Sequence, residues 1–140
     1  MKVLLAVDGS KFTKHMLAYL AAHDELIGPQ NRFTILTVVT PLPPEVSHFI
    51  DRESIENYYT EKAEGVLRPV MAFAAQHSCN VVTTHAIGQS AETIAATASE
   101  GHFDLLVMGS HGHSTLGSLV MGSVVHSVMG RCKTPMLIVR

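Results

Sequence analysis

The sequence contains few charged residues and no excess of basic ones. Lys and Arg number 10 against 12 Asp and Glu, the formal net charge is -2, and charged residues make up 16% of the chain. Proteins that bind nucleic acid usually carry a clear basic excess, because their cations neutralise backbone phosphates. The charge balance therefore argues against a nucleic-acid-binding protein.

Long apolar runs and paired cysteines are also lacking. The first apolar run, Val3–Val7, ends at Asp8, so it is shorter than the apolar core of a signal peptide. No run approaches the ~20 apolar residues that span a bilayer. Cys79 and Cys132 are the only cysteines and lie far apart in the sequence, so we expect two reduced thiols. These absences predict a cytoplasmic protein without membrane insertion.

The motifs of several enzyme classes are missing as well. The sequence contains no His-Glu-x-x-His, Gly-x-Ser-x-Gly or Cys-x-x-Cys, which argues against zincins, esterase-type hydrolases and zinc deaminases. No Gly-x-Gly-x-x-Gly follows the first apolar run, so a dinucleotide fold is not indicated. Gly117–Ser123 has the outline of a P-loop, but no lysine precedes the serine to reach the β- and γ-phosphates. We therefore exclude a P-loop ATPase.

The nine histidines do not form a recognisable metal motif. His111 and His113 lie two residues apart and His126 follows on a predicted helix, whereas a metal site requires three or four ligands with supporting hydrogen bonds. We favour solvated imidazoles, or imidazoles beside a phosphate, over metal ligands.

What the chain does contain is a regular alternation of predicted strands and helices. With 140 residues, of which 46% are hydrophobic, it can bury a sizeable core and is not disordered. Apolar and β-branched runs predict strands at Val3–Val7, Phe33–Val39, Asn80–Ala86, Phe103–Met108 and Pro135–Val139. Helical spacing predicts helices from the N-cap Ser10 to Gly28, from Asp51 to His77 with a kink near Gly65, from Ala91 to Glu100 and from Leu119 to Arg131, with a loop at Pro41–Pro44. The alternation predicts an α/β fold: a single domain over residues 1–140, with a doubly wound parallel sheet and helices on both faces.

In such sheets ligands bind at the carboxyl ends of the strands, and three predicted strands end in small or polar residues, at 8–10, 37–40 and 108–112. The last continues into a glycine-rich segment: two residues separate Gly109 from Gly112, nine separate Gly112 from Gly122, and Ser123 follows. Glycines allow close approach of a ligand, and a helix N-terminus after Gly122 favours a phosphate. From the residues alone, anion binding and a plain surface loop both remain open. For Asp8, a ligand contact and a simple turn also remain open.

Over essentially its whole length the chain resembles the universal stress protein family, and specifically its ATP-binding branch. The resemblance rests on residues 2–10, 103–112 and 132–139, and on the spacing of Gly109, Gly112, Gly122 and Ser123. It implies a five-stranded parallel sheet of order 3-2-1-4-5 that binds ATP or AMP. Bound ATP would suit Mg²⁺ or Mn²⁺ on its phosphates, while the glycine-rich segment contains no carboxylate for a dedicated metal site. The resemblance also implies a homodimer joined along Pro135–Val139, which as an uncovered apolar edge strand would invite aggregation, and a regulated protein partner of unknown identity.

The resemblance further implies a role for each matching residue. Asp8 and the backbone of Ala6 and Val7 would lie at the ribose and adenine. The remaining roles fall to Val38 at the adenine edge, Met108 and Gly109 beside the ribose, and Gly112, His113, Gly122, Ser123 and Val124 at the phosphates.

The chain departs from the family pattern at His113, where many nucleotide-binding relatives carry Arg or Lys, and at Gly117, where bulkier or basic residues are common. Imidazole, with an ordinary pKa of about 6.5, is a weaker cation at neutral pH, so we hypothesise weaker ATP binding that tightens toward pH 6. The leading interpretation is a stress-associated regulatory protein that acts through nucleotide-dependent conformation or partner binding. The alternatives are a nucleotide-independent dimeric scaffold, a slow ATP hydrolase, and an enzyme that uses His111 or His113 as acid or base.

Overall fold

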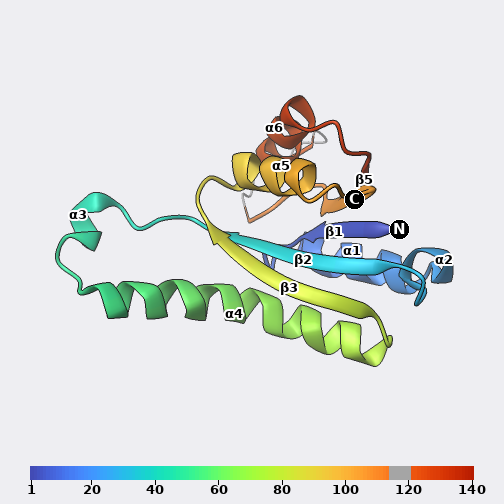
Figure 1. Ribbon diagram of the computed structural model, residues 1–140, viewed down its shortest axis with the longest axis horizontal. Coiled ribbons are helices and arrows are strands. Elements are labelled where there is room, and N and C mark those ends of the chain that lie inside the picture. The colour runs from blue at the N-terminus through green and yellow to red at the C-terminus, as the bar shows by residue number, and fades with distance from the viewer. Residues whose placement is uncertain (114–120) are drawn as a thin grey trace.

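The computed structural model describes residues 1–113 and 121–140, and its centre is one five-stranded sheet of order β3-β2-β1-β4-β5 (Figure 1). The strands are β1 (Lys2–Ala6), β2 (Arg32–Val39), β3 (Asn80–Ile87), β4 (Leu105–Gly109) and β5 (Met136–Val139). Every neighbouring pair is parallel. The fold class and the strand order are as expected, and chain order reverses between β1 and β4.

Helices cover both faces of the sheet. They are α1 (Lys11–Ala21), α2 (Asp24–Ile27), α3 (Pro44–Ser47), α4 (Arg52–Gln76), α5 (Ser90–Glu100) and α6 (Ser123–Arg131). In Figure 1, α1 and α4 lie on one side of the strands and α5 and α6 on the other. Connections between parallel strands therefore cross on both faces, which is the doubly wound arrangement.

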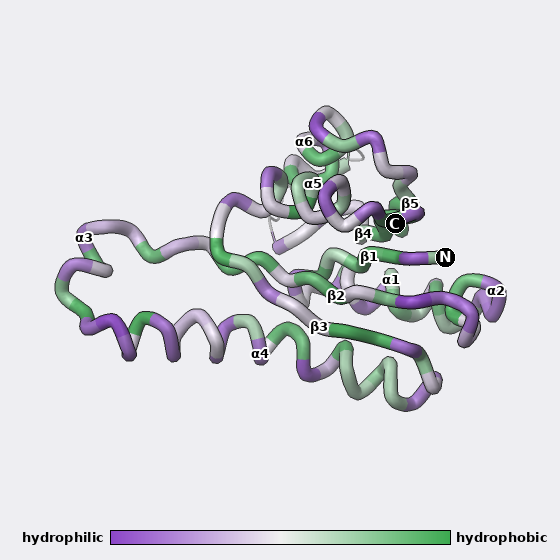
Figure 2. The backbone as a smooth tube through the Cα atoms, in the orientation of Figure 1, coloured by the Kyte–Doolittle hydropathy of each residue, from purple (hydrophilic) through white to green (hydrophobic). Residues whose placement is uncertain are grey.

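The central strands are apolar throughout because each buries side chains on both faces. In β1, Leu5 belongs to a core cluster with Met16 of α1 and Val70 of α4. Its neighbour Leu4 points to the opposite cluster, where it packs with residues of α5 and α6 such as Ile94 and Val128. Figure 2 shows the contrast with the start of α4, which is mostly hydrophilic where it extends beyond the sheet.

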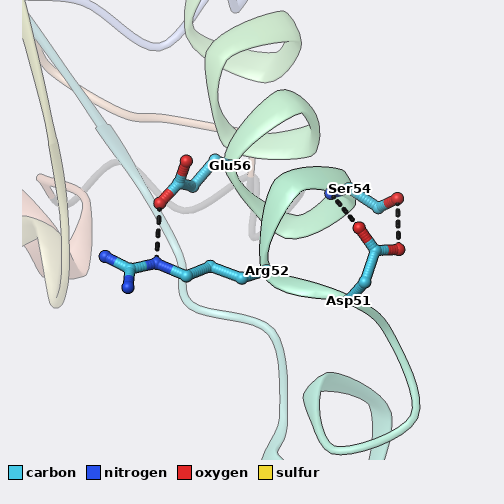
Figure 3. A network of polar contacts seen from close by, with 4 residues as sticks. All are labelled: Asp51, Arg52, Ser54 and Glu56. Carbon is cyan, nitrogen blue, oxygen red and sulfur yellow. Dashed lines mark hydrogen bonds and ion pairs between the residues drawn. The ribbon is translucent and has the colours of Figure 1, made fainter.

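Helix α4 begins with a side-chain cap and stays helical through Gly65 and Pro69. The Asp51 carboxylate accepts hydrogen bonds from the Ser54 backbone N–H at 3.0 Å and the Ser54 hydroxyl at 2.6 Å (Figure 3). Both bonds favour the ionised acid and lower the pKa of Asp51 below its ordinary value of 3.8. In Figure 1 the axis of α4 changes direction near its middle, in line with the bend predicted there.

Three predictions differ from the structure by more than two residues. The helix expected to run to Gly28 is interrupted, because α1 ends at Ala21 and His23 leaves the helical conformation before α2. The ring of His23 stacks on Tyr19, and its Nδ1–H donates to the Tyr19 carbonyl at 2.7 Å. A short helix, α3, begins within the expected proline loop, because proline is well tolerated in a first helical turn.

The last predicted helix also begins later than expected. Its first expected residues, 119 and 120, lie outside the described residues, and α6 begins at Ser123. Gly122 has an extended backbone, and its N–H donates to the Ser110 carbonyl at 2.7 Å. This hydrogen bond holds the start of α6 against the end of β4.

Candidate functional site

A cavity of about 480 Å³ opens at the carboxyl ends of β1, β2 and β4. Its size falls within the roughly 300–1,000 Å³ of small-molecule sites, and its position is the point where the strand order reverses. The cavity brings together all the residues singled out from the sequence: Ala6, Val7, Asp8, Val38, Met108, Gly109, Gly112, His113, Gly122, Ser123 and Val124. Their individual roles toward a nucleotide stay predictions.

Asp8 organises the turn between β1 and α1. Its Oδ1 accepts hydrogen bonds from the Ser10 N–H at 2.9 Å and the Thr13 hydroxyl at 3.1 Å. Its own N–H donates to the Thr13 hydroxyl at 3.2 Å. Oδ2 points instead toward Gly112, where an added Cβ would lie only 2.6 Å from it. Asp8 therefore makes the turn and also presents an oxygen at the cavity, so the two interpretations of this residue are compatible.

The prediction that the Ser10 side chain caps the first helix is wrong. Ser10 occupies the N-cap position of α1, but its side chain makes no capping hydrogen bond. The residue is 6% exposed, and its Oγ finds no hydrogen-bond partner among the described residues. The neighbouring Asp8 carboxylate accepts the Ser10 N–H instead, so the acid organises this turn in place of the hydroxyl.

Two histidines of the glycine-rich segment attach it to the first strand and helix. The Nε2–H of His113 donates to the Asp8 carbonyl at 2.6 Å. The Nδ1 of His111 lies 3.0 Å from the Ser110 hydroxyl, and its ring faces Phe12 at 5.0 Å between centroids. Both rings line the cavity and hold the end of β4 close to the β1–α1 turn.

Gly109 allows α1 to approach β4 closely. A Cβ added to Gly109 would lie 2.7 Å from Cβ of Phe12 and 3.0 Å from its carbonyl oxygen. No ordinary side chain fits against the backbone at that distance. This glycine therefore has a packing role in addition to its place in the cavity wall.

The sequence analysis missed the parts of the wall that come from α4 and α5. Tyr58, Lys62 and Val66 line the cavity from α4, and Ser90 and Ile94 line it from α5. No motif marks these residues. The four-residue spacing of the α4 residues indicates only a shared helix face, and the packing of the helix decides that this face meets the cavity.

The described residues form neither a metal-binding cluster nor a membrane-spanning helix. Nowhere in 1–113 and 121–140 do three or more His, Cys, Asp or Glu side chains gather in a group able to hold a metal ion. Within the same ranges, each helix is too short or too polar to cross a membrane.

Comparison with known proteins identifies the family. The universal stress protein family model matches residues 1–140. A Thermus aquaticus protein, the universal stress protein in the QAH/OAS sulfhydrylase 3' region, is 30% identical over 138 residues, which cover 99% of this chain and 97% of the relative.

Solved structures agree in fold. The universal stress protein UspA from Lactobacillus plantarum matches with a TM-score of 0.80 at 21% identity, over 100% of this chain and 97% of that one. An Arabidopsis thaliana protein of the family, solved with AMP bound, matches with a TM-score of 0.71 at 14% identity, over 99% of this chain and 90% of that one. The chain therefore belongs to the universal stress protein family.

Proposed function

We propose that this protein is a regulatory protein that binds an adenine nucleotide, ATP or AMP, in the cavity at the carboxyl edge of the sheet. The observation that carries the proposal is the convergence of the β1 end, the β2 end and the glycine-rich segment on one cavity of about 480 Å³. The AMP bound to the Arabidopsis thaliana relative supports an adenine nucleotide as the ligand class.

The cavity offers suitable chemistry for each part of a nucleotide. The start of α6 presents backbone N–H groups, the positive end of the helix dipole and the Ser123 hydroxyl, which together suit a phosphate. Gly112 lets the backbone of this segment lie directly against the Asp8 carboxylate, since an added Cβ would come within 2.6 Å of Asp8 Oδ2. Val38 and Met108 supply apolar surface for the base and sugar. Any Mg²⁺ or Mn²⁺ would arrive bound to the phosphates and would owe its binding mainly to them.

We propose regulation rather than turnover as the mode of action. The segment before Ser123 lacks the lysine that reaches the outer phosphates in P-loop enzymes. We therefore expect any ATP hydrolysis to be slower than about 1 s⁻¹, at the low end of enzyme rates.

The proposal includes a cytoplasmic homodimer and a regulated protein partner. β5 is an outer strand of the sheet, and Met136, Leu137 and Ile138 on it are only partly buried. Pairing of this strand with the same strand of a second copy would provide hydrogen-bond partners for the backbone N–H and C=O groups on its outer edge. A protein that sediments as a monomer at micromolar concentration would contradict the dimer and leave the nucleotide site unaffected.

The test is to identify the nucleotide that acid releases from the purified protein, and then to titrate ligand-free protein with ATP and AMP by calorimetry. Ser123→Ala removes a hydroxyl at the cavity and should weaken binding several-fold, while Ser127→Ala, four residues on in the same helix, should not. Protein that is purified free of nucleotide and binds neither ATP nor AMP would favour a nucleotide-independent scaffold.

The pH dependence expected from His113 stays a prediction. Affinity for ATP should increase from pH 8 to pH 6 in the wild type and not in His113→Ala. A flat profile in the wild type would contradict it.

A further inference from the structure

The walls of the cavity carry few fixed charges. Among the described residues that line it, Asp8 is the fixed anion and Lys62 the fixed cation. The imidazoles of His111 and His113 also line it. The sequence of segment 114–120 contains no Asp, Glu, Lys or Arg. An anionic ligand in this cavity would therefore meet one permanent positive charge, and it comes from α4 rather than from the glycine-rich segment.

The packing of α4 holds Lys62 at the cavity. Tyr58, Lys62 and Val66 follow one another at four-residue steps on one face of the helix. Val66 fixes this face, because it packs against the core cluster beneath α1 and α4 and lies beside Gly9 of the β1–α1 turn. One turn away, the Lys62 Nζ lies 5.7 Å from the centre of the Tyr58 ring, a cation–π distance.

The ammonium of Lys62 has no carboxylate partner among the described residues. The arginines on α4 do have one: Arg52 pairs with Glu56 at 3.0 Å and Arg68 with Glu64 at 3.5 Å. At the helical neighbours of Lys62, positions 58, 59, 65 and 66, the sequence has two Tyr, a Gly and a Val. None of these four helical neighbours therefore competes with a ligand for this charge.

We infer that Lys62 binds the phosphate chain of the ligand and makes the site prefer a nucleoside triphosphate to a monophosphate. The inference rests on the proposed function and names the specificity residue of that same site. Backbone N–H groups and imidazoles hold a phosphate without a permanent charge, whereas an ammonium attracts it in proportion to the ligand's charge. A lysine on a flexible stem can reach the outer phosphates as a point charge.

The inference predicts that the loss from removing Lys62 grows with ligand charge. Calorimetric affinities would be measured for ATP, AMP and adenosine with the wild type, Lys62→Met, Lys62→Arg and Lys14→Met. Lys62→Met keeps an unbranched stem without charge and should weaken ATP binding about tenfold, AMP binding less and adenosine binding not at all. Lys62→Arg should retain most of the ATP affinity. Lys14→Met removes an exposed lysine outside the cavity and should change nothing.

The outcomes separate the two proposals. If the wild type binds ATP and Lys62→Met leaves its affinity unchanged, or lowers ATP and adenosine affinity by the same factor, the inference is wrong and the proposed function stands. If the wild type binds none of the three ligands, the proposed function fails and the inference fails with it. Thermal melts of each variant would check that the fold is intact.

Discussion

The contact between Gly109 and Phe12 makes a quantitative prediction for Gly109→Ala. The new Cβ would lie 2.7 Å from one Phe12 atom and 3.0 Å from the Phe12 carbonyl oxygen. Cβ and the carbonyl are fixed to the backbone, so α1 must move away from β4 as a unit. Overpacking of this kind costs about 1–3 kcal/mol. Because a chain of this length loses roughly 3–4 °C in Tm per kcal/mol, we expect Tm to fall by about 3–12 °C.

Gly65→Ala is the matched control for this substitution. Gly65 lies inside α4, and apart from the backbone of the helix itself no atom of the described residues comes within 4 Å of the position of an added Cβ. Alanine loses less backbone entropy there, so the variant should be more stable than wild type by about 0.5–1 kcal/mol. Melts followed by circular dichroism without ligand would compare both variants with wild type. A Gly109→Ala protein that melts within about 1 °C of wild type would refute the packing argument.

Three further predictions concern Ser10, Asp51 and Cys79. Ser10→Ala removes a buried hydroxyl that has no hydrogen-bond partner in 1–113 or 121–140, so in urea unfolding the variant should match wild type or gain up to about 1 kcal/mol. A loss of about 1 kcal/mol, as at a working N-cap, would contradict this. Hydrogen bonds from Ser54 lower the pKa of Asp51, so the ionised acid stabilises the folded protein above its ordinary value of 3.8, and that contribution is lost as pH falls through the lowered pKa. The stability difference between wild type and Asp51→Ala should therefore be constant above about pH 5 and shrink on acidification; a difference independent of pH would exclude the charge as its source. Burial raises the pKa of the Cys79 thiol, so less of the reactive thiolate is present at mildly alkaline pH. Iodoacetamide should therefore label Cys79 more slowly in the folded protein than in urea, as measured by mass spectrometry. Equal labelling rates would disprove the shift.

The strands could be predicted from the sequence because burial on both faces requires a continuous apolar run. Leu4 and Leu5 illustrate this, since neighbours in one run serve opposite cores. The break after α1 could not be predicted in the same way. No glycine or proline marks positions 22 and 23, and the break instead accompanies the stacking of Tyr19 on His23.

The cavity was predictable where it is made by strand ends and not where it is made by helix faces. Asp8 follows β1 and Gly109 is the last residue of β4, and parallel topology brings such strand ends to one edge. Lys62 lies in the middle of a long helix, and its position depends on the contact of Val66 with the core cluster beside the β1–α1 turn. That contact joins segments far apart in the sequence, so helical periodicity alone carries no information about it.

The cavity has walls from both layers of the molecule, and this has a consequence for cooperativity. Its wall on α4 belongs to the layer that packs with α1, and its wall on α6 belongs to the opposite layer. A ligand that contacts both walls opposes the opening of either layer, and at 100 times its Kd it would add about 2.7 kcal/mol to the stability of the whole fold. Amide hydrogen exchange should then slow together in α4 and α6, although the sheet lies between them.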